Sequence, residues 1–349
     1  MTLKFAGMDL GTSTLKTSFE NGTKKYKMIS MLGDVNEGWT GMSVDKSWIN
    51  NLVIKHEDKE YFVGELARTQ SEIKYALVSE GRMKSAENAF IALKSSLTNV
   101  AEDGDEFIIG VGVPVATSMN EMKELSRLLK GSHEIDARND ATGEEKHMTV
   151  EVKKCQVIPE PYGTYYWTLK QRNVDVAIDA VIIDIGHGST DYLAMYQGRP
   201  MRQSSGSLNE AVDTLTSRIS KKLNDQTGKY IRPYELMKAI ELGRDAVMVG
   251  GETFSIKEIK EYYAEQIAKI MVDETERLIS FMPPDAFVEL YVCTGGGAYT
   301  FGSYIQQALA NMKMIAAPED CVIPEDPVMS NAMGFELVVR DRAEEKDTE

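Results

Sequence analysis

The chain has 349 residues and carries 54 acidic against 39 basic side chains, a formal net charge of −15. Its hydrophobic fraction of 42% and charged fraction of 27% are typical of a folded globular protein and exclude a fibrous or disordered chain. The length is sufficient for two domains, and so acidic a surface repels phosphate backbones, which argues against direct nucleic-acid binding over a broad face.

The N-terminal segment predicts a strand over residues 5–10, a polar turn, and a second strand over 15–19. The turn lies within Asp9–Lys16 (Asp-Leu-Gly-Thr-Ser-Thr-Leu-Lys), where a glycine and small hydroxyl residues let successive backbone N–H groups converge on an anion. Lys16 would place a positive charge beside phosphate oxygens, and Asp9 is suited to hold Mg²⁺ through the waters that this ion retains. The alternative is an ordinary hairpin turn.

The next segment, residues 26–80, reads as an insertion. It predicts short strands over 26–31, 48–54 and 61–63 and a helix that begins near Glu65. After it, the apolar run 107–113 predicts a strand that ends at Pro114.

Two prolines flank Glu160 in the segment Ile158-Pro-Glu-Pro-Tyr-Gly163, and they restrict the backbone around its carboxylate. The functional interpretation is that Glu160 orients the water that attacks a terminal phosphate, because positioning supplies most of the catalysis in phosphoryl transfer. A rigid surface turn is the alternative.

A second copy of the first turn follows about half the chain later. The strand over 181–185 leads into Asp184–Thr190 (Asp-Ile-Gly-His-Gly-Ser-Thr), and a further strand covers 191–196. Two such hairpins predict two similar domains, which together would clamp the phosphates of a nucleotide. Asp184 is the second carboxylate suited to magnesium. His187 is interpreted as a loop side chain and not as a catalyst.

Residues 207–282 predict mainly helices. Ser207 and Glu210 have capping-box spacing, Pro233 suits the first turn of a helix, and Gly243 would end it. A third helix is predicted over 256–282, stopped by two prolines, with one buried face formed by Ile259, Tyr263, Ile267, Ile270 and Met271.

A strand over 288–293 then runs into Thr294-Gly-Gly-Gly-Ala-Tyr299, where three residues without side chains would let the backbone approach a flat ring or a ribose phosphate. A tight strand-to-helix turn is the alternative. No GxGxxG or GxxxxGK[ST] pattern occurs, so the sequence lacks the Rossmann and P-loop fingerprints.

The spacing of the cysteines and histidines predicts neither a metal site nor a disulfide bond. Cys155, Cys293 and Cys321 are far apart in sequence, which predicts buried thiols in a reducing compartment, and the four histidines have no metal-ligand spacing. No apolar stretch is long enough to span a bilayer, and the acidic tail 344–349 would be repelled by anionic lipid. We therefore expect a cytoplasmic protein with no membrane role.

In their order and spacing, these segments resemble the actin-like ATPase superfamily, which also includes chaperone ATPases and sugar kinases. Five stretches carry the resemblance: Asp9–Lys16 looks like the first phosphate loop, Gln156–Gly163 like the first connecting segment, Asp184–Asp191 like the second phosphate loop, Thr294–Tyr299 like the adenosine loop, and Met329–Gly334 like the second connecting helix. Two further stretches, Tyr61–Ala67 and Ile109–Pro114, look like the ParM-type bacterial and archaeal actins, which segregate plasmids.

The resemblance implies an α/β, actin-like (ribonuclease H-like) two-domain ATPase fold with a nucleotide cleft between the domains. Domain I would comprise 1–179 and 329–349 with an outer subdomain at 26–80, and domain II would comprise 180–328 with an outer subdomain at 207–282.

The implied ligands are ATP and Mg²⁺. Asp9 and Asp184 would hold the metal mainly through water, and Glu160 and Asp184 would be the catalytic residues. The nucleotide would be bound by Gly11, Thr12, Ser13, Thr14, Lys16, Gly186, His187, Gly188, Ser189, Thr190, Gly295, Gly296, Gly297 and Tyr299. One departure from the pattern is His187, which replaces a small residue.

The leading hypothesis is a polymerising ATPase that forms head-to-tail filaments with copies of itself, which ATP hydrolysis destabilises. Resemblance to ParM implies plasmid segregation through a DNA-binding adaptor protein, without direct contact to nucleic acid. The alternative is a small-molecule, sugar-type kinase of the same superfamily, although no sugar-kinase signature is present. A chaperone-like ATPase is disfavoured, because little sequence follows the second connecting helix.

Overall fold

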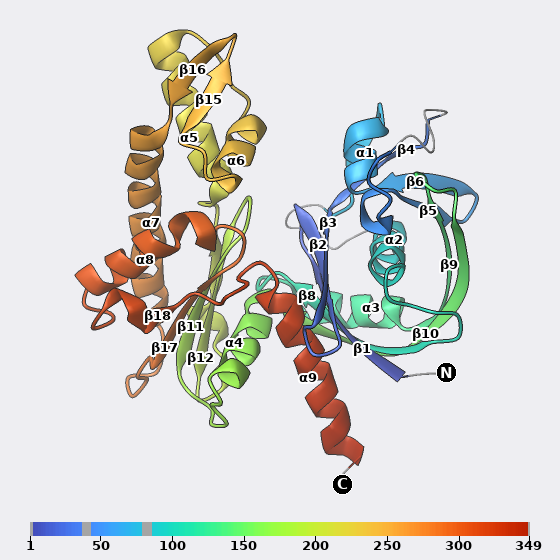
Figure 1. Cartoon of the computed structure of the whole chain (residues 1–349). Coiled ribbons are helices and arrows are strands. Elements are labelled where there is room, and N and C mark those ends of the chain that lie inside the picture. The colour runs from blue at the N-terminus through green and yellow to red at the C-terminus, as the bar shows by residue number, and fades with distance from the viewer. Residues whose placement is uncertain (1–2, 37–42, 79–85, 348–349) are drawn as a thin grey trace. The chain divides into compact units, whose positions relative to one another are not determined.

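The computed structural model describes residues 3–36, 43–78 and 86–347. The chain forms two units, Met1–Trp167 with Asn331–Glu349 (unit 1) and Thr168–Ser330 (unit 2). The chain leaves unit 1 within helix α4 (Glu160–Gln171) and returns to it within the first turn of α9 (Ser330–Asp347) (Figure 1). The sequence prediction had placed these boundaries at 179/180 and 328/329.

A ten-stranded sheet organises unit 1, in the order β3-β2-β1-β8-β10-β9-β5-β6-β4-β7. Strands β1, β8 and β10 pair in parallel, and every other neighbouring pair is antiparallel. The strands are β1 (Leu3–Leu10), β2 (Thr14–Phe19), β3 (Lys24–Ile29), β4 (Met31–Asp34), β5 (Leu52–His56), β6 (Lys59–Val63), β7 (Lys74–Ala76), β8 (Glu106–Val113), β9 (Gly131–Asn139) and β10 (Glu145–Pro159).

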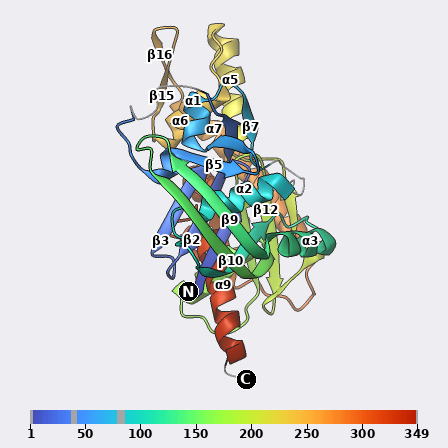
Figure 2. The ribbon, with the colours of Figure 1, turned by 90° about the vertical axis from the view of Figure 1, so that its right-hand side faces the viewer.

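The long strand β10 joins the inner sheet to the outer strands. Its second half pairs with β8 and its first half pairs with β9, which in turn pairs with β5. Figure 2 shows β9 and β10 as two long strands side by side. The predicted strand over 26–31 is in fact two strands, because β3 ends at Ile29 and β4 begins at Met31. The predicted strand over 48–54 begins instead with a 3₁₀ turn, Trp48–Asn50, before β5.

Helices α2 (Ala86–Leu97) and α3 (Met119–Leu129) pack on this sheet, and α1 (Glu65–Gln70) packs beside β4 and β6. The start of α1 at Glu65 agrees with the sequence prediction. Ser118 and Glu121 form a capping box that begins α3.

Helix α9 packs against β1 and α4 at a backbone-to-backbone distance that only glycine permits. A Cβ on Gly7 would lie 1.9 Å from the carbonyl oxygen of Ala332, and one on Gly334 would lie 1.8 Å from that of Gly163. Neither distance is compatible with a real Cβ atom, so these glycines allow α9 to lie directly on its neighbours.

Unit 2 contains a second mixed sheet in the order β13-β12-β11-β17-β18, with β14 paired to β12. Its strands are β11 (Ala180–Ile185), β12 (Thr190–Tyr196), β13 (Arg199–Pro200), β14 (Gly206–Leu208), β17 (Leu290–Thr294) and β18 (Cys321–Val322). Its helices are α5 (Val212–Thr227), α6 (Pro233–Glu241), α7 (Lys257–Ile279) and α8 (Ala298–Asn311). Helix α7 packs against α5, α8 and β12.

The region 207–282 differs from its prediction at several points. Ser207 lies in β14 and does not cap a helix; α5 begins at Val212, where the hydroxyl of Thr214 accepts the backbone N–H of Ala211 instead. Ile270 on α7 is 37% exposed and lies outside the buried face, which Ile267 and Met271 do form.

Predictions for α6 are confirmed, since the helix starts at Pro233 and Gly243 follows its end with a φ of 65°. A two-stranded hairpin, β15 (Ala246–Val249) and β16 (Glu252–Ser255), was not predicted.

All three cysteines are buried, as predicted. Burial raises the pKa of Cys155 and of Cys321 to about 12 and raises that of Cys293 well above its usual value. Among the residues that the structure describes, none of the helices combines the length and apolar character needed to cross a membrane.

Candidate functional site

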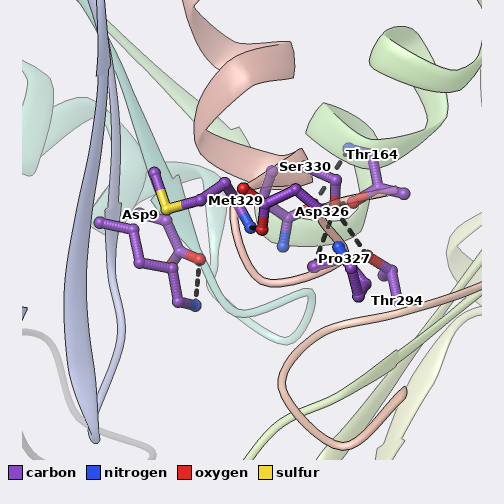
Figure 3. Close-up of polar contacts among 9 residues, drawn as sticks. Asp9, Thr164, Thr294, Asp326, Pro327, Met329 and Ser330 are labelled. Carbon is purple, nitrogen blue, oxygen red and sulfur yellow. Dashed lines mark hydrogen bonds and ion pairs between the residues drawn. The ribbon is translucent and has the colours of Figure 1, made fainter. Parts of the chain in front are cut away.

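The first polar turn connects β1 and β2, and its residues are held by strand pairing. Asp9 pairs across the hairpin with Lys16, and their side chains form an ion pair of 2.7 Å. Asp9 is only 2% exposed, so its carboxylate is fixed and largely withdrawn from water. Gly11 makes the turn possible, because a Cβ there would lie 2.8 Å from the carbonyl oxygen of Thr14. Figure 3 shows Asp9 with this ion pair as a dashed line.

The second polar turn, between β11 and β12, repeats the geometry of the first. Asp184 pairs with Asp191 at the same register as Asp9 with Lys16. Gly186 lies where Gly11 lies, with its N–H donating to the carbonyl of Ser189 at 2.8 Å. The structure therefore confirms the internal repeat at the level of individual cross-strand pairs.

One difference between the two hairpins is chemical. The first pairs a carboxylate with an ammonium group, whereas the second places two carboxylates opposite each other. Two neighbouring carboxylates repel unless a cation or hydrogen-bond donors compensate them. Asp191 is 8% exposed and was not assigned a role from the sequence. The sequence could have identified Asp191 as a site residue, since it occupies the position in the repeat that corresponds to Lys16.

Glu160 lies at the junction of β10 and α4, as the first residue of the helix and not in a surface turn. Negative charge is favoured at this end of a helix. Because β1, β8 and β10 are parallel and β8 lies between the other two, Glu160 and Asp9 are at the same edge of the sheet. They are separated by two strand spacings, roughly 10 Å, across the sheet, and Glu160 lies two residues further along than the residue level with Asp9. The Glu160 side chain passes over Gly112 of β8, where a Cβ would come within 3.1 Å of its Cγ.

The three glycines after β17 have different reasons to be glycine. A Cβ on Gly295 would lie 2.3 Å from a carboxylate oxygen of Asp184, and one on Gly297 would lie 2.2 Å from Cγ2 of Ile185. These two residues allow the turn to pack against the second hairpin, which the parallel pairing of Asp184 with Thr294 places alongside it. Gly296 is exposed, with no atom within 4 Å of an added Cβ, so of the three it is the one open to a ligand.

Three other predicted nucleotide ligands have specific surroundings in unit 2. The buried hydroxyl of Thr190 donates to the carbonyl of Glu210 at 2.7 Å, so its proton is engaged in holding the segment before α5. The carbonyl of His187 accepts the backbone N–H of Asp213 at 2.9 Å. Tyr299, near the start of α8, is 68% exposed.

The remaining predicted ligands lie in the two turns. Thr12 and Thr14 are half-buried and Ser13 is exposed in the first turn, and Gly188 and Ser189 are half-buried in the second. The structure thus gathers Asp9 to Lys16 with Glu160 at one sheet edge in unit 1. In unit 2 it gathers Asp184 to Thr190 with the glycine turn.

The described residues contain no cluster of three or more His, Cys, Asp or Glu side chains that could hold a metal. This finding is compatible with Mg²⁺, which usually keeps several waters and needs only one or two carboxylates beside substrate phosphates. The carboxylate chemistry of Asp9 and Asp184 fits such a metal. Neither Cys293 nor Cys321 is a candidate nucleophile, because burial keeps both thiols protonated.

Two family models match the chain. The model described as "Actin like proteins N terminal domain" matches residues 7–163, and "Archaeal actin homologue MreB-like, C-terminal" matches residues 182–307. The first includes Asp9 to Lys16 and Glu160, and the second includes Asp184 to Thr190 and the triple glycine.

This chain is an actin-like protein.

Solved structures of other actin-like proteins share this fold. The archaeal actin homologue Ta0583 superposes with a TM-score of 0.77 at 20% identity, covering 98% of this chain and 100% of that one. A ParM protein from a 15-stranded filament of Clostridium botulinum gives 0.75 at 18% identity, covering 98% and 100%. ParM of Bacillus thuringiensis with AMPPNP gives 0.68 at 12% identity, covering 98% and 100%.

The predicted α/β, actin-like two-domain fold and the resemblance to ParM-type proteins are therefore confirmed. At these identities the structural likeness establishes fold alone. Comparison with curated proteins finds no significant match.

Proposed function

We propose that this actin-like chain is an ATPase that assembles head-to-tail into filaments, and that hydrolysis of ATP destabilises them. The observation that carries the proposal is the repeated hairpin, in which Asp9 and Asp184 occupy the same register position and each is followed by a tight glycine turn. Such turns direct backbone N–H groups at anions, and one in each unit suits a ligand with several phosphates.

The four charged residues predicted for the site each have a defined task in this proposal. Asp9 and Asp184 would hold Mg²⁺ through its waters, and the metal would supply charge neutralisation on the phosphates. Lys16 exchanges its ion pair with Asp9 for a contact to phosphate oxygens, so ATP and Asp9 compete for the same ammonium group. Glu160, at the edge that also carries Asp9, orients the attacking water.

The nucleoside would lie against the exposed Gly296, with Tyr299 nearby on α8. In support of nucleotide binding, the comparison structures include the archaeal homologue in complex with ADP and the B. thuringiensis ParM with AMPPNP. In support of assembly, they include a ParM filament.

The wider role that we propose is segregation of plasmid DNA in the cytoplasm through a DNA-binding adaptor protein. A net charge of −15 disfavours direct DNA contact, so an intermediary would carry the positive surface. The same charge makes identical copies repel, and assembly should therefore strengthen with moderate salt or Mg²⁺, unless the contacts are themselves ion pairs.

The test is sedimentation and negative-stain microscopy with ATP, ADP and a non-hydrolysable ATP analogue, alongside phosphate release. Wild-type protein should pellet with ATP and then disassemble as phosphate appears, and Glu160→Ala should pellet and persist. A matched control is Glu124→Ala, which removes an exposed carboxylate on α3 and should behave as wild type. Absence of polymer with ATP at every protein concentration would refute the proposal.

A further inference from the structure

The chain's return to unit 1 is marked by two neighbouring residues that are each hydrogen-bonded within their own unit. Ser330, the last residue of unit 2, is fully buried, and Asn331, the first residue of the returning segment of unit 1, is 5% exposed. Burying a polar side chain this deeply destabilises the fold unless the side chain is hydrogen-bonded, so the hydrogen-bond partners of these two residues constrain the local structure.

Ser330 belongs to a cluster that holds the glycine turn. Its hydroxyl lies 2.6 Å from that of Thr294, and both hydroxyls lie within 3.1 Å of the carbonyl oxygen of Pro327. The N–H of Gly295 donates to the same carbonyl at 3.0 Å. Figure 3 shows Thr294, Pro327 and Ser330 with hydrogen bonds among them as dashed lines.

Because each hydroxyl carries one proton, the two cannot both donate to Pro327 and to each other; one donates to the carbonyl and the other to its neighbouring hydroxyl. The arrangement fixes Thr294, and through it Gly295, against the segment that leads into α9.

Asn331 makes the equivalent attachment in unit 1. Its amide oxygen accepts the hydroxyl of Thr164 at 2.6 Å and the backbone N–H of Thr164 at 3.1 Å. Thr164 is fully buried on α4, one helical turn after Glu160. The position of the first turn of α4, and therefore of Glu160, thus depends on Asn331.

We propose that Ser330 and Asn331 act together as positioning residues, which tie the glycine turn of the nucleotide site to the helix that carries Glu160 through a single peptide bond. This inference rests on the proposed function and adds to it: a displacement of the turn by bound nucleoside is passed to the residue that orients water. Substitution of Thr294 tests the hydrogen bonds of Ser330, and substitution of Thr164 tests those of Asn331.

The threonines offer matched variants, because Val preserves the shape of Thr without its hydroxyl and Ser preserves the hydroxyl. In the full chain with ATP and Mg²⁺, Thr294→Val should raise the nucleotide Kd by about 3- to 10-fold, the effect of one buried hydrogen bond. It should also lower kcat, because the turn is then no longer tied to the segment that positions the helix carrying Glu160. Thr164→Val should lower kcat by about 3- to 10-fold with the nucleotide Kd unchanged. Thr294→Ser and Thr164→Ser should retain wild-type values.

Coupling between the two ends is measured with the double Val variant, with phosphate release normalised to pelleted protein. The loss in kcat/KM should be smaller than the product of the single losses, whereas independent sites give the product. Thermal unfolding of the Val variants, compared with that of the Ser variants, corrects for loss of folded protein.

Two failures are distinguishable. If the wild type binds and hydrolyses ATP while Thr164→Val keeps the same kcat, or while the double variant gives the full product, this inference is overturned and the proposed function stands. If the wild type neither binds nor hydrolyses ATP, the proposed function fails and the inference with it.

Discussion

Glu336 is a buried carboxylate on α9 whose removal should destabilise unit 1. The residue is fully buried and accepts hydrogen bonds from the hydroxyl of Ser18 at 2.8 Å and from the backbone N–H groups of Asn21 and Gly22 at 2.6 and 3.1 Å. It also forms a 2.6 Å ion pair with Arg340. It therefore holds the turn between β2 and β3 against the C-terminal helix.

The expected magnitude follows from these contacts. Glu336→Ala leaves two backbone N–H groups and a partly buried guanidinium without their acceptor. Breaking a buried ion pair by removing one partner typically costs about 3–5 kcal/mol. For a unit of this size each kcal/mol lowers the melting temperature by roughly 2–4 °C, so unit 1 should melt roughly 6–20 °C below the wild type.

Differential scanning calorimetry measures this change, and Glu336→Gln separates charge from shape. The Gln variant keeps one carbonyl acceptor and should lie between the wild type and Glu336→Ala. Glu124→Gln on the exposed face of α3 should shift unfolding by less than about 0.5 kcal/mol. A Glu336→Ala variant within about 1 kcal/mol of the wild type would refute the reasoning.

Other predictions concern packing, pH and thiol reactivity. Gly334→Ala should destabilise unit 1 by at least 1–3 kcal/mol, the usual cost of overpacking, because its Cβ would lie 1.8 Å from the carbonyl oxygen of Gly163; chemical denaturation measures it. Burial lowers the pKa of His133 below 6.5, so the folded state binds fewer protons than the unfolded state and unit 1 should lose stability as pH falls below about 6.5. The thiols of Cys155 and Cys321, with pKa values of about 12, should not react with a thiol reagent at pH 8 until the protein unfolds.

Each of these expectations has a control and a contrary result. Gly206→Ala, where a Cβ would meet Leu278 at an ordinary 3.7 Å, controls for the added methyl group; equal effects at both glycines would contradict the packing argument. His133→Gln should flatten the pH dependence. Because hydrogen bonds to Asp136 and Glu145 raise the pKa of the exposed His147, that residue acts in the opposite direction, and an unchanged slope in His133→Gln would count against His133. A thiol that reacts rapidly in the native protein would contradict the burial of the cysteines.

The strands and turns that carry the candidate site were predictable because they depend on local sequence. The runs 5–10 and 181–185, before Gly11 and Gly186, are apolar except for one aspartate in each, as expected for strands in the buried centre of a sheet. Their repetition predicted two similar hairpins, and the matching strand register within each hairpin confirms the repeat. The turn geometry itself requires glycine, so the position of each turn could be predicted from its glycine.

Features that depend on distant partners were not predictable. Ser207 and Glu210 have the spacing of a capping box, yet pairing of β14 with β12 draws Ser207 into a strand. No local pattern shows why Gly295 and Gly297 must be glycine, because Asp184 and Ile185 occupy the space that a side chain at these positions would need. The cluster of Thr294 and Ser330 joins residues that no local pattern connects.

The discontinuity of unit 1 has a consequence for the order in which the protein can fold. Ser18 and its partner Glu336 are 318 positions apart, and β1 has its close contact with α9 near Ala332. At the usual pace of synthesis, about 5–20 residues per second, the first strands leave the ribosome long before the helix they require. Unit 2 is one continuous stretch and can complete its core first. During every round of translation, therefore, the unit that carries Asp9 and Glu160 is the last to be completed, and the strands β1 and β2 that contact α9 stay uncovered by it until that helix emerges.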